Sequence, residues 1–133
     1  MNLSKTEIRV LIKGWLKHWN NYNLKGVMEL IHEDIVFENW TGVIINGKKN
    51  LQRSWTPWFI NNENFKFIEE DIFIDEQEQK VLFRWCLHWP SPEKEYNGKT
   101  EIRRGVDVLL FKDKKIYSKY SYSKTTTQIS SLL

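Results

Sequence analysis

Asp107 is the residue of this sequence whose type and surroundings most suggest chemistry. It lies between two valines in the stretch 99–111, whose β-branched and apolar residues predict a strand. A carboxylate in such a strand loses much of its hydration, so it must find a partner or take part in a reaction. Held neutral, it could donate a hydrogen bond to a carbonyl or an enolate; charged, it could act as a general base. The alternative is a structural aspartate that stabilises the sheet by pairing with Arg103, Arg84 or a backbone amide.

Aromatic residues offer walls for a pocket around this acid. Seven tryptophans and 14% aromatic residues are a large share for 133 residues. Such side chains either line an apolar pocket or fill the interior completely. The candidates for a ligand-binding wall are Trp15, Trp40, Trp55, Phe59 and Trp85. Tyr120 and Tyr122 share one face of the last predicted strand, where they would either line the pocket or stack within the sheet.

Two other polar side chains are candidates for the same site. Arg103 shares a strand face with Asp107, where it would favour an anionic or carbonyl-bearing ligand. The alternative for Arg103 is a surface salt bridge with Glu101 or Glu70. His88 lies near a strand end and is a second candidate catalyst, or else an ordinary surface histidine. No cluster has metal-ligand spacing and no glycine-rich loop supports a nucleotide, so we expect neither a metal nor a cofactor.

Composition narrows the class of protein. The length fits a single domain over residues 1–133, and the net charge of +3 is spread without a dense basic block, which argues against nucleic acid as a partner. Cys86 is the only cysteine, so no intrachain disulfide can form. The amino terminus has no apolar signal core, and no apolar run is long enough to cross a bilayer. We therefore expect a cytoplasmic protein with no membrane contact.

The elements that must position Asp107 follow from local patterns. Ser4 and Glu7 form a capping box before a helix over 5–20 with one apolar stripe, and Gly14 within it indicates close packing or pocket space. Further elements are expected in chain order: a short helix carrying 24–31, a strand over 34–40, a helix from 47 whose second half Pro57 makes irregular or kinked, and strands over 65–74, 80–89, 99–111 and 116–124. The tail over 125–133 is expected to be partly mobile. This order predicts an α+β fold with a curved antiparallel sheet and three helices on one face, a cone with an interior pocket.

Two segments carry a family resemblance. One is the hairpin that starts at Gly105-Val106-Asp107-Val108-Leu109-Leu110-Phe111 and continues through a charged turn to Lys115-Ile116; the other covers 19–24 and 31–38. With them, residues 4–124 resemble the nuclear transport factor 2-like superfamily, and the SnoaL-like branch in particular. The resemblance implies the cone-shaped fold. It leaves the activity open, because this fold hosts isomerases, cyclases, dehydratases, hydrolases and non-catalytic binders.

The resemblance also implies a place for three residues. Ketosteroid isomerase, a member of this superfamily, uses a carboxylate base with a tyrosine and a protonated aspartic acid that hold the oxyanion. Asp107 matches that aspartic acid, Trp15 the tyrosine, and Asn39 the carboxylate base. An amide cannot accept and return a proton, so Asn39 argues against ketosteroid isomerisation itself.

Two hypotheses follow for the function. In the first, the chain is a cofactor-independent enzyme of the isomerase, cyclase or lyase type, acting on a small apolar carbonyl compound at Asp107. Trp15, Asn39 and either His88 or a tyrosine would assist. In the second, it is a non-catalytic ligand-binding or dimerisation module with a structural Asp107. Relatives commonly form homodimers through the sheet, and apolar residues on both faces of 80–89 agree with that.

Overall fold

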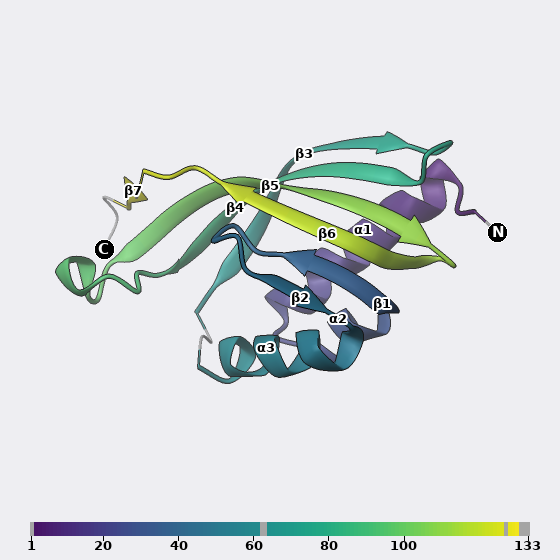
Figure 1. Ribbon diagram of the computed structural model, residues 1–133. Coiled ribbons are helices and arrows are strands. Elements are labelled where there is room, and N and C mark those ends of the chain that lie inside the picture. The colour runs from purple at the N-terminus through teal and green to yellow at the C-terminus, as the bar shows by residue number, and fades with distance from the viewer. Residues whose placement is uncertain (1, 62–63, 127, 131–133) are drawn as a thin grey trace.

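The described residues form a curved seven-stranded sheet with three α-helices. The computed structural model describes residues 2–61, 64–126 and 128–130. The elements in chain order are α1 (Lys5–Asn20), α2 (Leu24–Glu29), β1 (Ile31–Glu38), β2 (Ile44–Asn46), α3 (Lys48–Asn61), β3 (Lys66–Asp75), β4 (Lys80–Pro90), the 3-10 helix η1 (Lys94–Tyr96), β5 (Thr100–Lys112), β6 (Lys115–Ser123) and β7 (Gln128–Ile129). Figure 1 shows β4, β5 and β6 as long curved strands, with α1 running across the sheet and α3 lying beneath β1 and β2.

The sheet is mixed, so the purely antiparallel sheet expected from the strand pattern is wrong for one pair. The strand order is β2-β1-β6-β5-β4-β3, with β7 added to β5. β1 pairs with β6 in parallel, while the other pairs are antiparallel. A parallel pair needs a long crossover rather than a hairpin, and here the whole of β2 to β5 intervenes. The predicted α+β class with helices packed on a curved sheet is confirmed.

Helix α1 occupies the predicted residues. Ser4 Oγ accepts from the backbone N–H of Glu7 at 3.1 Å, and the Glu7 carboxylate accepts from the Ser4 N–H at 2.9 Å. These bonds satisfy two of the N–H groups that a helix start leaves free. The buried stripe of the helix consists of Ile8, Ile12, Trp15 and Trp19. Gly14 lies off this stripe, and a Cβ added there would meet nothing within 4 Å beyond the helix itself, so close packing is not the reason for this glycine.

Several boundaries differ from the predicted ones because of tertiary pairing. The strand β1 begins at Ile31, which the helical pattern had placed in α2, because Ile31 pairs with Ile116 of β6. The three-residue β2 and two-residue β7 are too short for a periodic signal, and β7 orders part of the tail by pairing with Glu101 and Ile102. α3 continues through Pro57 instead of becoming irregular there. Residues 127 and 131–133 of the tail lie outside the described residues.

The register of β4, β5 and β6 sets what faces the helices. Phe83 of β4 pairs with Asp107 of β5, which pairs with Ser121 of β6. All three side chains are buried, on the face covered by the helices. Between the Phe111–Ile116 pair and the Leu110–Ser118 pair the register shifts by one residue, a bulge at Tyr117. Beyond this bulge Lys119 and Ser121 take the inner face, whereas strict alternation from the buried Ile116 would have placed Tyr120 and Tyr122 there.

Candidate functional site

An aromatic cavity of about 360 Å³ lies between the sheet and the helices. Its lining comes from α1, α3, β1 and the turn after it, and β3 to β6: Trp15, Leu16, Trp19, Phe37, Asn39, Trp40, Thr41, Ser54, Trp55, Trp58, Phe67, Phe83, Trp85, Trp89, Asp107, Lys119 and Ser121. All seven tryptophans of the chain line it. The indoles therefore leave an open cavity rather than filling the interior.

The aromatic wall is held by edge-to-face and tilted contacts between its rings. The ring centroids of Trp19 and Trp55 are 5.0 Å apart, and those of Trp40 and Trp85 are 5.7 Å apart. Such pairs stabilise one another beyond the area they bury. Rings locked in this way give the cavity a fixed shape, which lowers the cost of ordering when an apolar ligand binds.

Gly105 makes room for one wall of the cavity. It pairs with Trp85 across β5 and β4. A Cβ on Gly105 would lie 2.5 Å from a carbon of the Trp85 indole and 2.3 Å from the backbone carbonyl oxygen of Tyr122. The glycine therefore lets the Trp85 ring lie against the β5 backbone.

Three polar side chains form a hydrogen-bonded cluster in the cavity lining, which we call the Asp107–Lys119–Ser121 cluster. Lys119 Nζ lies 3.1 Å from Asp107 Oδ2 and 2.6 Å from Ser121 Oγ, and Ser121 Oγ lies 2.7 Å from Asp107 Oδ1. All three residues are buried, with exposed fractions of 4%, 8% and 4% for Asp107, Lys119 and Ser121. The Lys119 ammonium also sits 4.9 Å from the centre of the Phe37 ring. An ion pair this deeply buried is costly to break, because removal of one partner leaves an uncompensated charge.

The structure gathers most of the sequence-predicted residues around Asp107. Trp15, Asn39, Trp40, Trp55 and Trp85 line the cavity with it. The side-chain oxygen of Asn39 accepts from the Trp40 backbone N–H at 2.8 Å and so fixes the turn at the end of β1. Asp107 pairs with neither Arg103 nor Arg84: Arg84 lies 3.9 Å from Asp71, and Arg103 faces Glu101.

Four predicted residues lie elsewhere. Phe59 is buried behind the wall, against Trp19 at 4.8 Å. His88 belongs to the outer-face positions of β4, and Tyr120 and Tyr122 to those of β6, so none of the three lines the cavity. Tyr122 is 53% exposed.

Arg103 stands beside the cavity rather than in its lining. Its guanidinium carbon is 5.3 Å from the centre of the Trp40 ring, and its Nε donates to Glu101 Oε2 at 3.3 Å. The same Glu101 oxygen accepts from the Trp89 indole N–H at 2.5 Å. Glu101 is fully buried, so this is an internal ion pair and not the surface salt bridge considered from the sequence. It supports Trp40 and Trp89, two walls of the cavity.

Sequence reasoning missed Lys119, Ser121, Trp58 and Trp89 as lining residues. The tryptophans could have been found from helical spacing in α3 and from alternation in β4. Lys119 and Ser121 could not, because the bulge at Tyr117 reverses the alternation of β6 and leaves no signal in the sequence.

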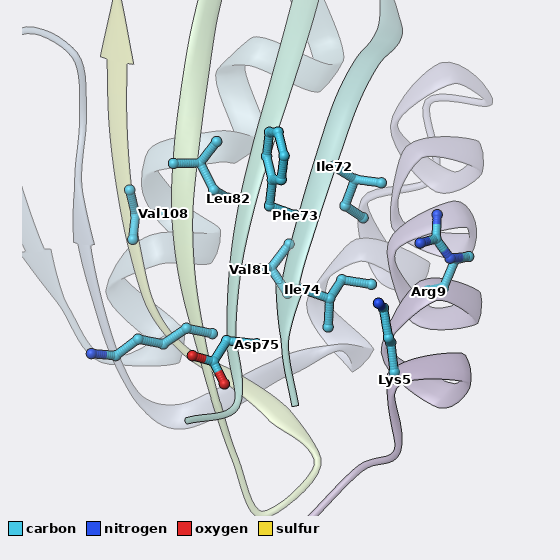
Figure 2. A pocket seen from close by; sticks show the side chains of 10 residues that line it. Lys5, Arg9, Ile72, Phe73, Ile74, Asp75, Val81, Leu82 and Val108 are labelled. Carbon is cyan, nitrogen blue, oxygen red and sulfur yellow. The ribbon is translucent and has the colours of Figure 1, made fainter. Parts of the chain in front are cut away.

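A second hollow of about 370 Å³ lies at the start of α1 and the adjoining ends of β3 and β4. Figure 2 shows Lys5 and Arg9 of α1 beside Ile72 and Ile74 of β3. Lys5 and Arg9 are exposed, and the hollow contains none of the predicted site residues. Among the described residues there is also no group of three or more histidines, cysteines or acids that could hold a metal ion.

Comparison with known proteins assigns the family. The SnoaL-like domain model matches residues 12–119. This chain belongs to the SnoaL-like domain family. The match runs from within α1 to within β6 and includes Asp107 and Lys119. No match was found among curated proteins. No helix of the described residues is long and apolar enough to cross a membrane.

Solved structures similar to this SnoaL-like chain share its fold. RV0760c from Mycobacterium tuberculosis is 17% identical, with a TM-score of 0.77 over 96% of this chain and 99% of that one. Delta 5-3-ketosteroid isomerase from Mycobacterium sp. is 17% identical, with a TM-score of 0.76 over 93% and 98%. BvnE pinacolase from Penicillium brevicompactum is 14% identical, with a TM-score of 0.76 over 94% and 89%. At such identities the likeness concerns the fold.

Proposed function

We propose that this protein binds a small, largely apolar carbonyl compound in the aromatic cavity and carries out cofactor-independent acid–base chemistry on it, of the isomerase, cyclase or lyase kind. The observation that carries the proposal is the presence of Asp107 in the cavity lining, with a second titratable group, Lys119, 3.1 Å away. An Asp107 bonded only to arginine or to backbone amides would have argued for a structural role.

The cluster supplies the groups that such chemistry needs. A carboxylate next to a bound carbonyl compound can take a proton from the carbon beside the carbonyl. A positive group close by stabilises the negative charge that then develops on the oxygen, and it is most effective where water is excluded. Asp107 can act as the base that takes this proton, so no carboxylate is needed at the position of Asn39. Neither step requires a metal or an organic cofactor.

Related structures support the proposal of a small, largely apolar ligand. RV0760c has been solved in complex with estradiol-17beta-hemisuccinate, and a computationally designed 17-OHP binder has the same fold, with a TM-score of 0.75 to this chain. For this chain we extend that only to the class of ligand, a compact ring skeleton with a polar oxygen. The single buried cysteine, Cys86, agrees with the cytoplasm as the compartment we propose.

A thermal-shift screen followed by one substitution tests the proposal. Ketones and other carbonyl compounds with fused rings are screened against the purified protein, since a ligand that binds only the folded state raises the melting temperature. Each hit is then incubated with the protein to look for conversion. We expect Asp107→Asn to abolish conversion while the hit is still bound. Binding without conversion of any hit would support the non-catalytic alternative, and absence of any carbonyl hit would contradict the proposal.

Exposed apolar residues on the outer sheet face favour the alternative of a non-catalytic dimerisation module. Large apolar side chains are exposed there: Ile68, Phe73, Leu82 and Tyr122. Phe73 and Leu82 are cross-strand partners, 61% and 39% exposed. A second copy of the chain covering this face would form a homodimer through the sheet. Sedimentation should give twice the chain mass of 16.1 kDa, and Phe73→Glu should return the monomer; a wild-type monomer at high concentration would exclude the homodimer.

A further inference from the structure

The proton positions in the Asp107–Lys119–Ser121 cluster follow from its connections. A lysine ammonium can only donate, a hydroxyl donates once and also accepts, and a carboxylate only accepts. Lys119 Nζ lies 2.6 Å from Ser121 Oγ, so Ser121 accepts there and directs its own proton to Asp107 Oδ1. Lys119 also forms an ion pair with Asp107, with Nζ 3.1 Å from Oδ2. Both carboxylate oxygens of Asp107 thus face donors, which assigns Asp107 as an acceptor.

Lys119 keeps one donor unused. Its ammonium has three N–H groups: one donates to Ser121 Oγ, and the ion pair with Asp107 Oδ2 faces a second. No third hydrogen-bond partner lies among the described residues. The ammonium sits over the face of Phe37, a cavity-lining ring, and Lys119 itself lines the cavity. The cation–π contact, the hydrogen bond to Ser121 and the ion pair with Asp107 hold the charge at this place and leave one N–H group without a partner among the described residues.

We infer that Lys119, and not Asp107, is the group of this cavity that donates to the ligand's oxygen. The inference rests on the proposed function and narrows its ligand class to ring compounds whose polar oxygen is anionic or becomes so, that is, carboxylates, phenolates or enolates. This differs from an oxyanion site in which a neutral aspartic acid is the donor. Asp107 and Ser121 orient the ammonium, and Asp107 remains the proton acceptor.

Three naphthalene probes of similar size separate the two proposals. 2-Naphthoate has an anionic oxygen, 2-acetylnaphthalene has a neutral carbonyl, and 2-isopropylnaphthalene has no acceptor. Calorimetric titration of the wild-type protein should rank them in that order of affinity, and we expect 2-naphthoate to bind about ten- to a hundredfold more tightly than 2-isopropylnaphthalene, as a hydrogen bond from a charged donor predicts. Failure of all three to bind would contradict both proposals. Binding without preference for the oxygen would contradict only the inference about Lys119.

Two variants decide which group is the donor. Asp107→Asn removes the carboxylate that competes for Lys119, so 2-naphthoate should bind more tightly than to wild type, about tenfold or more. Asp107→Asn/Lys119→Met removes both charges and so leaves no unpaired buried charge. This double variant should bind the three probes with equal affinity. Lys124→Met, at an exposed lysine just beyond β6, is the matched control and should leave the affinity for all three probes unchanged. A loss of 2-naphthoate affinity in Asp107→Asn, or retained preference in the double variant, would overturn the assignment.

Discussion

Gly105→Ala should destabilise the protein and deform the cavity. The added Cβ would lie 2.3 Å from the carbonyl oxygen of Tyr122 and 2.5 Å from the Trp85 ring, whereas ordinary van der Waals contact begins at about 3.4 Å. A gap of about 1 Å must be opened, and one of the two neighbours is backbone in the centre of the sheet. Overpacking of this kind costs about 1–3 kcal/mol. The gain from replacing glycine in a strand, about 0.5–1 kcal/mol, offsets only part of it.

Gly14→Ala is the matched control, because it makes the same chemical change where space is free. A Cβ there meets nothing within 4 Å outside the helix, so only the helix preference of alanine remains. We expect a gain of about 0.5–1 kcal/mol. Urea unfolding followed by circular dichroism gives both free energies on one scale.

The two results together test whether close approach at Gly105 shapes the cavity. Gly105→Ala should lower the free energy of unfolding, and tryptophan fluorescence of the folded variant should change because Trp85 must move. Equal stability of Gly105→Ala and wild type, with unchanged fluorescence, would refute the reasoning. A loss of stability in Gly14→Ala would show that substitution of either glycine is harmful for another reason.

Further predictions concern the buried charges, the cysteine and the first helix cap. Lys119→Met leaves the Asp107 charge unpaired and should cost about 3 kcal/mol in urea unfolding, and Asp107→Asn/Lys119→Met should recover most of it; equal losses in both would contradict the ion pair. Burial raises the pKa of the Cys86 thiol above 9.0, so a thiol reagent should react far more slowly with the folded than with the unfolded chain. The contribution of this thiol to stability is present below pH 9.0 and is lost as the pH rises through the folded value; rapid labelling of the native protein would contradict this. The backbone N–H and the hydroxyl of Ser4 hold the pKa of Glu7 below 4.5, so in Ser4→Ala an NMR titration should find it closer to 4.5, and the lost helix cap should lower stability by about 1 kcal/mol.

Much of the fold was accessible from local sequence patterns. The capping box and apolar stripe of α1 are local features, and the predicted bounds of that helix are confirmed. The alternation over 80–89 predicts that Val81, Phe83, Trp85, Leu87 and Trp89 share one face of β4, and all five are buried. What failed depends on distant partners: the start of β1 at Ile31 and the parallel pairing with β6 are set by contacts that a local window does not contain.

Only about half of the candidate site could be predicted from the sequence, for the same reason. Asp107 stands out because an acid among valines is unusual anywhere in a strand. Its partner does not stand out, because a lysine in a hairpin strand normally faces water. Only the bulge at Tyr117 brings Lys119 to the inner face and sends Tyr120 and Tyr122 to the outer one.

Deuterium exchange of a bound carbonyl compound tests the central claim most directly. The strongest-binding ketone from the screen is incubated with the protein in deuterated water, and the exchange of the hydrogens beside its carbonyl is followed by NMR. We predict that the wild-type protein catalyses this exchange and that Asp107→Asn slows it at least about a hundredfold while still binding the ketone, as loss of a general base requires. Equal exchange rates in wild type and Asp107→Asn, or no exchange above the uncatalysed rate in either, would contradict acid–base chemistry at Asp107.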